Sequence, residues 1–502
     1  MSGFPRPRLV LSVALTISIM SPAFAAGVSF TAKSSAGYAG VNPSLQLHAD
    51  LNHDGREDFV FGIGFTETNV VLSNGDGTYA APVGYPLPYS EVQSAIALGD
   101  FNGDGNDDML IAGLNAYTGQ ADMFLYTNNG NGQFTMKASF PLSSPVTQMT
   151  TADFNHDGKM DVAVQGASGV SIWAGNGSGT FNIGPATAIK NVGGKMMLGD
   201  FDGDGHADLA IPDPVNMNNV EVLFGDGRGN FPSQYTIQVP GGSSQFQATD
   251  VNSDGTTDIV ASTFYPQYLN HIDVYYGGSS RNFVNHTIIH TAQCPVSAPV
   301  AADLDGNGYN DLVLEESNCA VLNNRSSTQF TVTVNVLTRN PNSSYNADQV
   351  VATLPTNTGI DADKGPVVIR GNADTKPDIL FTECVNSCAT NNTIVLLNTT
   401  AGAFHSCDAP LALEGINVCS PSMNGSSSSP VSFRVGAAGQ VAMRKVEVWV
   451  DGTKETEQLN GFSNYTFLDR SVTLGSGKHQ VNIYAAGIDN QLQEKSFSVY
   501  VP

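Results

Sequence analysis

Short apolar runs separated by polar, glycine-rich segments recur along most of the chain. In "LGDFNGDGNDDMLIAG", which runs from Leu98 to Gly113, crowded aspartates give way at once to Met109-Leu110-Ile111. Apolar runs of this length bounded by turn residues are typical of β-strands, and helix-period stretches are hard to find in this sequence. The pattern therefore predicts an all-β protein.

The acidic segment recurs with a period near 50 residues. A seventh copy, "IRGNADTKPDILFTE" from Ile369, keeps Asp374 and Asp378 but has Arg370 at the leading position and Thr375 in place of glycine. Such self-similarity indicates a repeat architecture. The leading aspartates of the six intact copies are Asp50, Asp100, Asp153, Asp200, Asp250 and Asp303.

A second signature follows the acidic segment and consists of a strand, a Gly/Asn turn and an aromatic residue that opens the next strand. It reads "VVLSNGDGTY" from Val70 and "EVLFGDGRGNF" from Glu221, and it drifts to "DVYYGGSSRNF" from Asp273 and "AVLNNRSSTQF" from Ala320. Each unit thus offers four short strands, and seven units predict a seven-bladed β-propeller. A linear solenoid is the alternative, but seven units suit a closed ring and no distinctive polar caps bracket the array.

A closed ring needs one blade completed from both ends of the array, because an unpaired strand edge would otherwise remain exposed. Val28–Ala32 is therefore predicted to be the outer strand of the last blade, which is formed from about Pro366 to Phe404. From about Cys407 the period stops, and alternating strands with an Asp451-Gly452 turn predict a small immunoglobulin-like β-sandwich. Its "VEVWVDGTK" stretch resembles the bacterial immunoglobulin-like modules appended to exported proteins, with Trp449 either in the core or facing solvent.

The N-terminus has the pattern of a secretory signal peptide. Arg6 and Arg8 precede an apolar run from Leu9 to Met20, and Ala23-Phe24-Ala25 is a small-x-small cleavage signature. A spanning helix needs about 20 apolar residues, so the 12-residue run favours a cleaved signal over a membrane anchor. The predicted domains are a signal peptide at 1–25, the propeller at 26–405 and the sandwich at 406–502, in a protein that is secreted or held at the cell surface.

Composition narrows the range of partners and predicts disulfides. The net charge of −24 argues against nucleic acid and anionic membranes, since both are bound by basic surfaces. An even number of cysteines in an exported protein predicts disulfide bonds, and pairing of sequence neighbours is preferred among the possible connectivities. The six cysteines lie in the second half of the chain, at Cys294, Cys319, Cys384, Cys388, Cys407 and Cys419.

The acidic loops have the ligand chemistry of a calcium site. Each intact loop reads Asp-x-[Asp/Asn]-x-[Asp/Asn]-Gly-x-x-Asp, with oxygen-bearing side chains at positions 1, 3, 5 and 9. Ca²⁺ prefers such oxygens, and glycine at position 6 permits the turn that brings the position-7 carbonyl round. A helix-loop-helix calcium hand is excluded, because position 12 is Phe61 in the first loop and Ile111 in the second, not a bidentate glutamate. The predicted ligands are Asp50, Asn52, Asp54 and Asp58; Asp100, Asn102, Asp104 and Asp108; Asp153, Asn155, Asp157 and Asp161; Asp200, Asp202, Asp204 and Asp208; Asp250, Asn252, Asp254 and Asp258; and Asp303, Asp305, Asn307 and Asp311.

This register resembles the FG-GAP (VCBS) repeat family, whose best-known members are the seven-bladed propellers of integrin α-chains. The resemblance spans about residues 26–404 and implies that each loop joins the first two strands of a blade and binds Ca²⁺. About six structural calcium ions are expected, with none in the seventh loop, where Arg370 is expected to neutralise Asp374 or Asp378. The six ligand sets hold 19 of the chain's 46 acidic residues, so six divalent ions would halve the formal charge of −24.

The predicted function is that of an exported, calcium-binding scaffold for binding or adhesion to an extracellular protein or glycan. No catalytic motif is found, so no enzymatic activity is expected. Glu315 and Glu316 are adjacent on a predicted strand and point to opposite faces, and Trp173 is expected in the core rather than in a sugar site. Two alternatives remain: a polysaccharide lyase or hydrolase with its site in the propeller funnel, and a purely structural envelope or matrix protein.

Overall fold

A computed structural model shows a chain built from β-strands, and its described residues contain no α-helix. None of the described residues forms a helix long and apolar enough to cross a membrane. The predicted signal peptide at 1–25 and the side chains of all six cysteines lie outside the described residues, so the export signal and the disulfides stay predictions. The structure describes residues 28–39, 41–63, 67–88, 91–115, 117–191, 193–216, 218–239, 245–252, 256–263, 270–292, 299–306, 310–317, 332–340, 344–354, 358–360, 366–372, 374, 376–385, 390–400, 415–421, 423–438, 443–459, 465–487 and 492–502.

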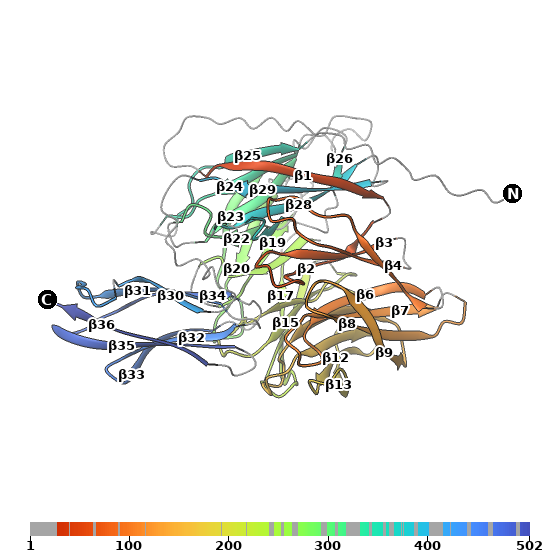
Figure 1. Ribbon diagram of the computed structural model, residues 1–502, viewed down its shortest axis with the longest axis horizontal. Coiled ribbons are helices and arrows are strands. Elements are labelled where there is room, and N and C mark those ends of the chain that lie inside the picture. Colours follow the sequence, from red (N-terminus) through yellow and green to blue (C-terminus); the bar gives the residue numbers. More distant parts are fainter. Residues whose placement is uncertain are drawn as a thin grey trace.

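Seven β-sheets occupy the described part of the chain between Phe30 and Asn398, one for each predicted repeat, and form a β-propeller (Figure 1). Six of them are antiparallel sheets of four consecutive strands. We call the sheets blades one to seven in chain order. The first six contain β2 (Val41–Ala49), β3 (Asp58–Ile63), β4 (Glu67–Val71) and β5 (Val83–Pro86); β6 (Glu91–Gly99), β7 (Asp108–Asn115), β8 (Ala121–Asn128) and β9 (Phe134–Leu142); β10 (Val146–Ala152), β11 (Asp161–Gly166), β12 (Gly169–Gly175) and β13 (Phe181–Thr187); β14 (Met197–Gly199), β15 (Asp208–Pro212), β16 (Asn219–Phe224) and β17 (Ser233–Gln238); β18 (Gln245–Thr249), β19 (Asp258–Thr263), β20 (Asn270–Tyr275) and β21 (His286–Ala292); and β22 (Val300–Ala302), β23 (Asp311–Ser317), β24 (Val332–Leu337) and β25 (Gln349–Leu354).

Blade seven closes the ring with a strand from the other end of the array, as predicted. It contains β26 (Thr358–Ile360), β27 (Val367–Ile369), β28 (Asp378–Val385) and β29 (Thr390–Asn398), and its outer strand is β1 (Phe30–Ala39). β1 runs antiparallel to β29, with Phe30 opposite Asn398 and Ala32 opposite Leu396. Val28 and Phe30 are buried in an apolar cluster shared by blades six and seven. This pairing removes an edge that would otherwise be free to associate.

The apolar cores lie between neighbouring blades. Val60 and Val70 of blade one pack in one cluster with Met109 and Phe124 of blade two. Trp173 is buried in a cluster shared by blades two and three, which confirms that it is a core residue. Position 2 of each intact acidic loop is also buried, so every loop is anchored in the core by its second residue: Leu51, Phe101, Phe154, Phe201, Val251 and Leu304.

One strand prediction was wrong. The sequence "AVLNNRSSTQF" from Ala320 was assigned to the third strand and turn of blade six, but the strand that pairs with β23 is β24, with Leu312 opposite Leu337. Residues 318–331 lie outside the described residues. β24 is buried at five of its six positions, and this apolar run is the better candidate for a central strand.

The C-terminal residues form a separate pair of sheets with a core of its own, beside the propeller in Figure 1. The Asp451-Gly452 turn has φ angles of 50° and 85°, the left-handed geometry that a tight two-residue hairpin requires. Trp449 is half-buried on the outer face, while Val448 and Val450 lie in the core. The two sheets contain β30 (Gly415–Ser420), β31 (Val431–Ala438) and β34 (Tyr465–Val472), and β33 (Thr453–Leu459), β32 (Met443–Val450), β35 (Gly477–Gly487) and β36 (Leu492–Val501). The likeness to an immunoglobulin domain stays a prediction.

Candidate metal centres

Loops one to six join the first and second strands of their blades, where the repeat pattern placed them, and loop seven joins β27 to β28. We number the loops with their blades, from loop one (50–58) to loop six (303–311), and loop seven is 370–378. The position-9 aspartate is the first residue of the second strand in blades one to six, as Asp58 is in β3, and Asp378 is the first residue of β28 in blade seven. The chain therefore turns back on itself within nine residues and brings its carboxylates together.

The loops are folded by their own hydrogen bonds. In loop two, the position-1 carboxylate accepts the backbone N–H of Asp104 (3.2 Å) and of Gly105 (2.9 Å). Asn102 Oδ1 accepts the N–H of Asp104 at 2.8 Å. The position-6 glycine has a φ of +86°, a conformation that costs other residues strain. Loops one, three and four have the same bonds within 0.3 Å, which gives them a common turn before any ion is considered.

The position-9 aspartate ties the loop to the end of the strand that follows in its blade. Asp208 Oδ1 accepts the N–H of Gly225 at 2.7 Å, and Oδ2 accepts the N–H of Phe201 at 2.9 Å. Asp378 of the decayed loop makes the same bonds, to Asn398 (2.7 Å) and Gly371 (2.9 Å). The position-9 carboxylate thus has a structural role that survives in the loop without the full motif. In all seven blades its Oδ1 accepts a backbone N–H at the end of the strand that follows, or one or two residues beyond that end.

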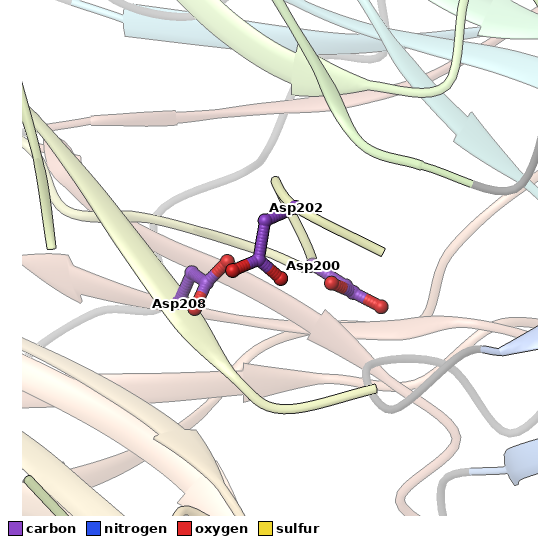
Figure 2. Close-up of side chains that lie close together, drawn as sticks. All are labelled: Asp200, Asp202 and Asp208. Atoms are coloured by element: carbon purple, nitrogen blue, oxygen red, sulfur yellow. The ribbon is translucent and has the colours of Figure 1, made fainter. Parts of the chain in front are cut away.

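Two loops bring three carboxylates within reach of one ion. Oxygens of Asp200, Asp202 and Asp208 lie within 4.8 Å of one another, and so do those of Asp303, Asp305 and Asp311. Figure 2 shows the first group, with the Asp202 carboxylate directed toward Asp208. These are the loops with aspartate at position 3, whereas loops one, two, three and five have asparagine there.

Burial raises the pKa of the clustered carboxyl groups. Desolvation is the largest cause, and neighbouring aspartates add to it, while backbone N–H donors lower the pKa. The pKa is raised to about 7 at Asp58 and Asp161 and to about 8 at Asp208 and Asp311. Ionising these buried, clustered carboxyl groups costs free energy, and a bound cation would reduce that cost.

The donor set fits Ca²⁺. Carboxylate and amide oxygens on a nine-residue turn with glycine at position 6 supply hard ligands in a flexible geometry. A carboxylate oxygen that accepts one backbone N–H retains lone pairs for an ion. The position-1 and position-9 side chains are the more buried ligands, and the position-5 aspartates Asp54, Asp104, Asp157 and Asp204 are exposed at the rim.

Two predicted ligands lie outside the described residues. These are Asp254 at position 5 of loop five and Asn307 at position 5 of loop six. The position-9 aspartates of both loops make the usual bond to position 2: Asp258 Oδ2 accepts the N–H of Val251 at 3.0 Å, and Asp311 Oδ2 accepts the N–H of Leu304 at 2.9 Å.

Neighbouring loops touch one another, a feature that one repeat cannot reveal. At position 4, His53 Nε2 lies 2.8 Å from Oδ1 of Asn106 at position 7 of the next loop. Loops three and four make the same contact, because His156 at position 4 and His206 at position 7 bring Nε2 and Nδ1 within 3.2 Å of each other. Position 8 bonds to position 1 of the preceding loop: Thr257 N–H donates to Asp200 O (2.8 Å) and Asn310 Nδ2 to Asp250 O (2.7 Å). The loops therefore form part of the contact between blades.

Loop seven differs from the expectation. Arg370 does not pair with Asp374 or Asp378 in the described structure; its ion pair is with Glu57 of loop one, at 3.5 Å. Both oxygens of Asp378 accept backbone N–H groups, and burial, the largest cause, raises the pKa of this carboxyl to about 7. Arg370 instead joins blade seven to blade one, together with a bond from Gly77 N–H to Gly371 O.

A pocket of about 460 Å³ lies between blades five and six. Val251 and Asn252 of loop five line it, opposite Arg339 and Tyr345 of blade six. Burial raises the pKa of the Tyr345 phenol. The volume falls in the range of small-ligand sites, and the lining mixes aromatic, amide and cationic groups.

The sequence matches a known family of repeats. FG-GAP-like repeats match residues 50–111, 100–164, 153–211 and 200–261, and each match begins at the leading aspartate of a loop. No curated protein matches the sequence.

Several solved structures are similar to this chain, each with a TM-score below 0.5. One is an Agrocybe aegerita lectin that recognises non-reducing terminal N-acetylglucosamine (18% identity, 71% of this chain and 86% of the lectin, TM-score 0.43). Another is the BP39L lectin from Burkholderia pseudomallei (16% identity, 63% and 86%, TM-score 0.41). BBS1N in complex with ARL6DN is a third (13% identity, 72% and 96%, TM-score 0.44).

Proposed function

From the FG-GAP-like repeats that run in tandem through residues 50–261, we propose that this protein is an exported, calcium-stabilised propeller that presents its surface loops to an extracellular protein or glycan. The observation that carries the proposal is the repetition of one preorganised carboxylate turn around the ring, at the contacts between blades. Calcium bound there would supply the positive charge that the clustered aspartates lack.

The distribution of perturbed carboxyl groups favours a scaffold. Raised carboxyl pKa values recur from loop to loop, at positions 1, 3, 8 and 9 of the acidic motif. Catalysis by a paired acid and base gathers its groups at a single place. A set repeated around a ring suits ion binding and rigidity.

The pocket between blades five and six is the proposed contact site for the ligand. Its wall includes Asn252, a predicted calcium ligand, so occupancy of loop five and ligand binding should be linked. Tyr276 and Tyr345 offer aromatic faces, and Ser344 and Thr287 offer hydroxyl groups, a combination that suits a sugar ring or a polar peptide side chain.

A screen of glycan and extracellular-protein arrays, run in millimolar calcium and in EGTA, tests this function. We expect a hit that is lost in EGTA and weakened by Tyr345→Ala, while the matched variant Tyr117→Ala, at an exposed site in blade two, binds normally. Turnover of a polysaccharide by the purified protein would contradict the scaffold and favour an enzyme. Self-association with no array hit would favour a structural protein.

A further inference from the structure

In sequence register Arg281 stands where the other turns have glycine, while Gly278 makes the backbone bond to the preceding loop, from its N–H to Phe201 O at 2.8 Å. The turn between the third and fourth strands has a second glycine at Gly77, Gly132, Gly179 and Gly229 in blades one to four, with φ angles of +74° to +83°. Blade five has Arg281 there, with a φ of +54°. A non-glycine residue in this left-handed region is uncommon, so contacts of the side chain must offset the strain.

This position faces the preceding blade. A Cβ on Gly132 would meet Leu72 of blade one, and a Cβ on Gly179 would meet Leu125 of blade two. A Cβ on Gly229 would lie 3.8 Å from Asn155, the position-3 residue of loop three. The side chain of Arg281 likewise extends to the preceding blade, where it reaches position 3 of loop four.

All the described side-chain partners of Arg281 belong to blade four. Its Nε donates to Asp202 Oδ2, and its Nη2 donates to Asp204 Oδ2 at 3.0 Å. Nη1 donates to Ser233 Oγ at 3.2 Å, and the guanidinium lies 5.1 Å from the centre of the Phe224 ring. The side chain is thus held by an aromatic face and two carboxylates at once.

The contacted oxygens are those that an ion would use. Asp202 Oδ1 accepts the N–H of Asp204, and Asp204 Oδ1 accepts the N–H of His206, so the loop's own turns occupy one oxygen of each carboxylate. Arg281 occupies the other oxygen of each. In loops one and three the position-5 carboxylates Asp54 and Asp157 pair with Arg56 and Lys159 at position 7 of the same loop, each at 3.6 Å.

The charge count agrees with this role. Loop four is the one intact loop with four aspartates at the ligand positions, and the others have three. With Arg281 counted, the ligand positions of loop four carry a net charge of −3, which is the charge of the ligand positions alone in loops three and five.

We propose that Arg281 is a built-in counter-ion of loop four that competes with calcium for Asp202 and Asp204, making this loop the weakest calcium site and coupling its occupancy to the turn of blade five. The inference rests on the proposed calcium binding. When loop four fills, the guanidinium leaves both carboxylates and the turn at 277–283 loosens. In calcium-poor surroundings the ion pair holds blades four and five together.

Calcium titration of chelator-stripped protein, followed by calorimetry, tests the competition. Glycine adopts the left-handed backbone conformation of Arg281 (φ +54°) without strain, so the Arg281→Gly variant should fold. We expect the weakest site to bind roughly tenfold tighter, since a charge-assisted bond is worth about 1.5–3 kcal/mol and each 1.4 kcal/mol is about tenfold. Arg228→Gln, which removes a charge from the corresponding turn of blade four, should leave the titration unchanged. Binding that is unaltered in Arg281→Gly, or one ion fewer, would overturn the inference.

Hydrogen–deuterium exchange of the wild-type protein gives a readout that needs no variant. Calcium should increase exchange in 277–283 while leaving 225–231, the matched turn with Gly229, unchanged or more protected. Slower exchange in 277–283 would show that Arg281 stays bound and would overturn the inference. If wild type and variant bind no calcium at all, the proposed function itself fails, and the inference falls with it.

Discussion

At the scale of single residues, the position-9 aspartate separates two roles that the sequence motif combines. It is a predicted calcium ligand in six loops, and in all seven blades it accepts backbone N–H groups in the interior. In loop seven the second role stands alone. The retention of Asp378 in a loop that has lost its leading aspartate is therefore explained by hydrogen bonding.

Asp378→Asn tests the structural role without a metal. An amide nitrogen cannot accept the N–H of Gly371 or Asn398, and a buried unsatisfied donor costs about 1–3 kcal/mol. We expect the free energy of unfolding to fall by about that amount, equally in EGTA and in calcium, as measured by denaturant titration. Asp208→Asn should lose the same stability in EGTA and a bound ion besides. A loss in Asp378→Asn that appears only in calcium would contradict this role.

The raised pKa values fix the sign of a pH effect. In the calcium-free protein, carboxyls such as Asp161 and Asp208 keep a proton up to about pH 7 or 8, whereas in the unfolded chain they lose it near pH 4. Their contribution to the free energy of unfolding is complete below pH 4 and is lost as the pH rises through 7 to 8. In EGTA the melting temperature should therefore fall from pH 5 to pH 8, and calcium should reduce the fall. A melting temperature that rises over that interval in EGTA would show that burial does not hold these carboxyls protonated.

At the scale of elements, strands and loops were predictable where each repeat carries its own signal. The period, the four strands of a blade and the strand from the N-terminal end were all readable, because alternation and turn residues act locally. The prediction of the third strand of blade six was wrong because "RSSTQF" resembles the turn signature of the other repeats. The strand that pairs with β23 is β24, and the turn that follows it has a different sequence. The local pattern fits either segment, and β24 is the segment that is buried between blades.

The closing strand β1 offers a test of the ring. Phe30 is 5% exposed in the cluster shared by blades six and seven, and truncating a buried phenylalanine costs about 3–5 kcal/mol. Phe30→Ala should lower the melting temperature, with Ser29→Ala as the matched control. Deletion of residues 28–39 should also cause self-association, seen by light scattering, because the edge of β29 becomes free. A monomeric, equally stable deletion variant would contradict the closure.

At the scale of the whole molecule, the acidic loops form part of the contacts that join neighbouring blades around the ring. Contacts from position 4 to position 7 and from position 8 to position 1 join successive loops, and Arg370 with Glu57 joins the last to the first. None of these partners was predictable from one repeat, since each lies about 50 residues away and depends on how the blades are set around the ring. The same reason hides Arg281, whose partners lie in the preceding blade.

The most direct test of the central claim is the melting temperature of the full chain measured against free calcium concentration. If the ions stabilise the blades, the melting temperature rises with the logarithm of calcium, with a slope that corresponds to about six ions released on unfolding. A flat curve from EGTA to millimolar calcium would contradict calcium stabilisation of the propeller.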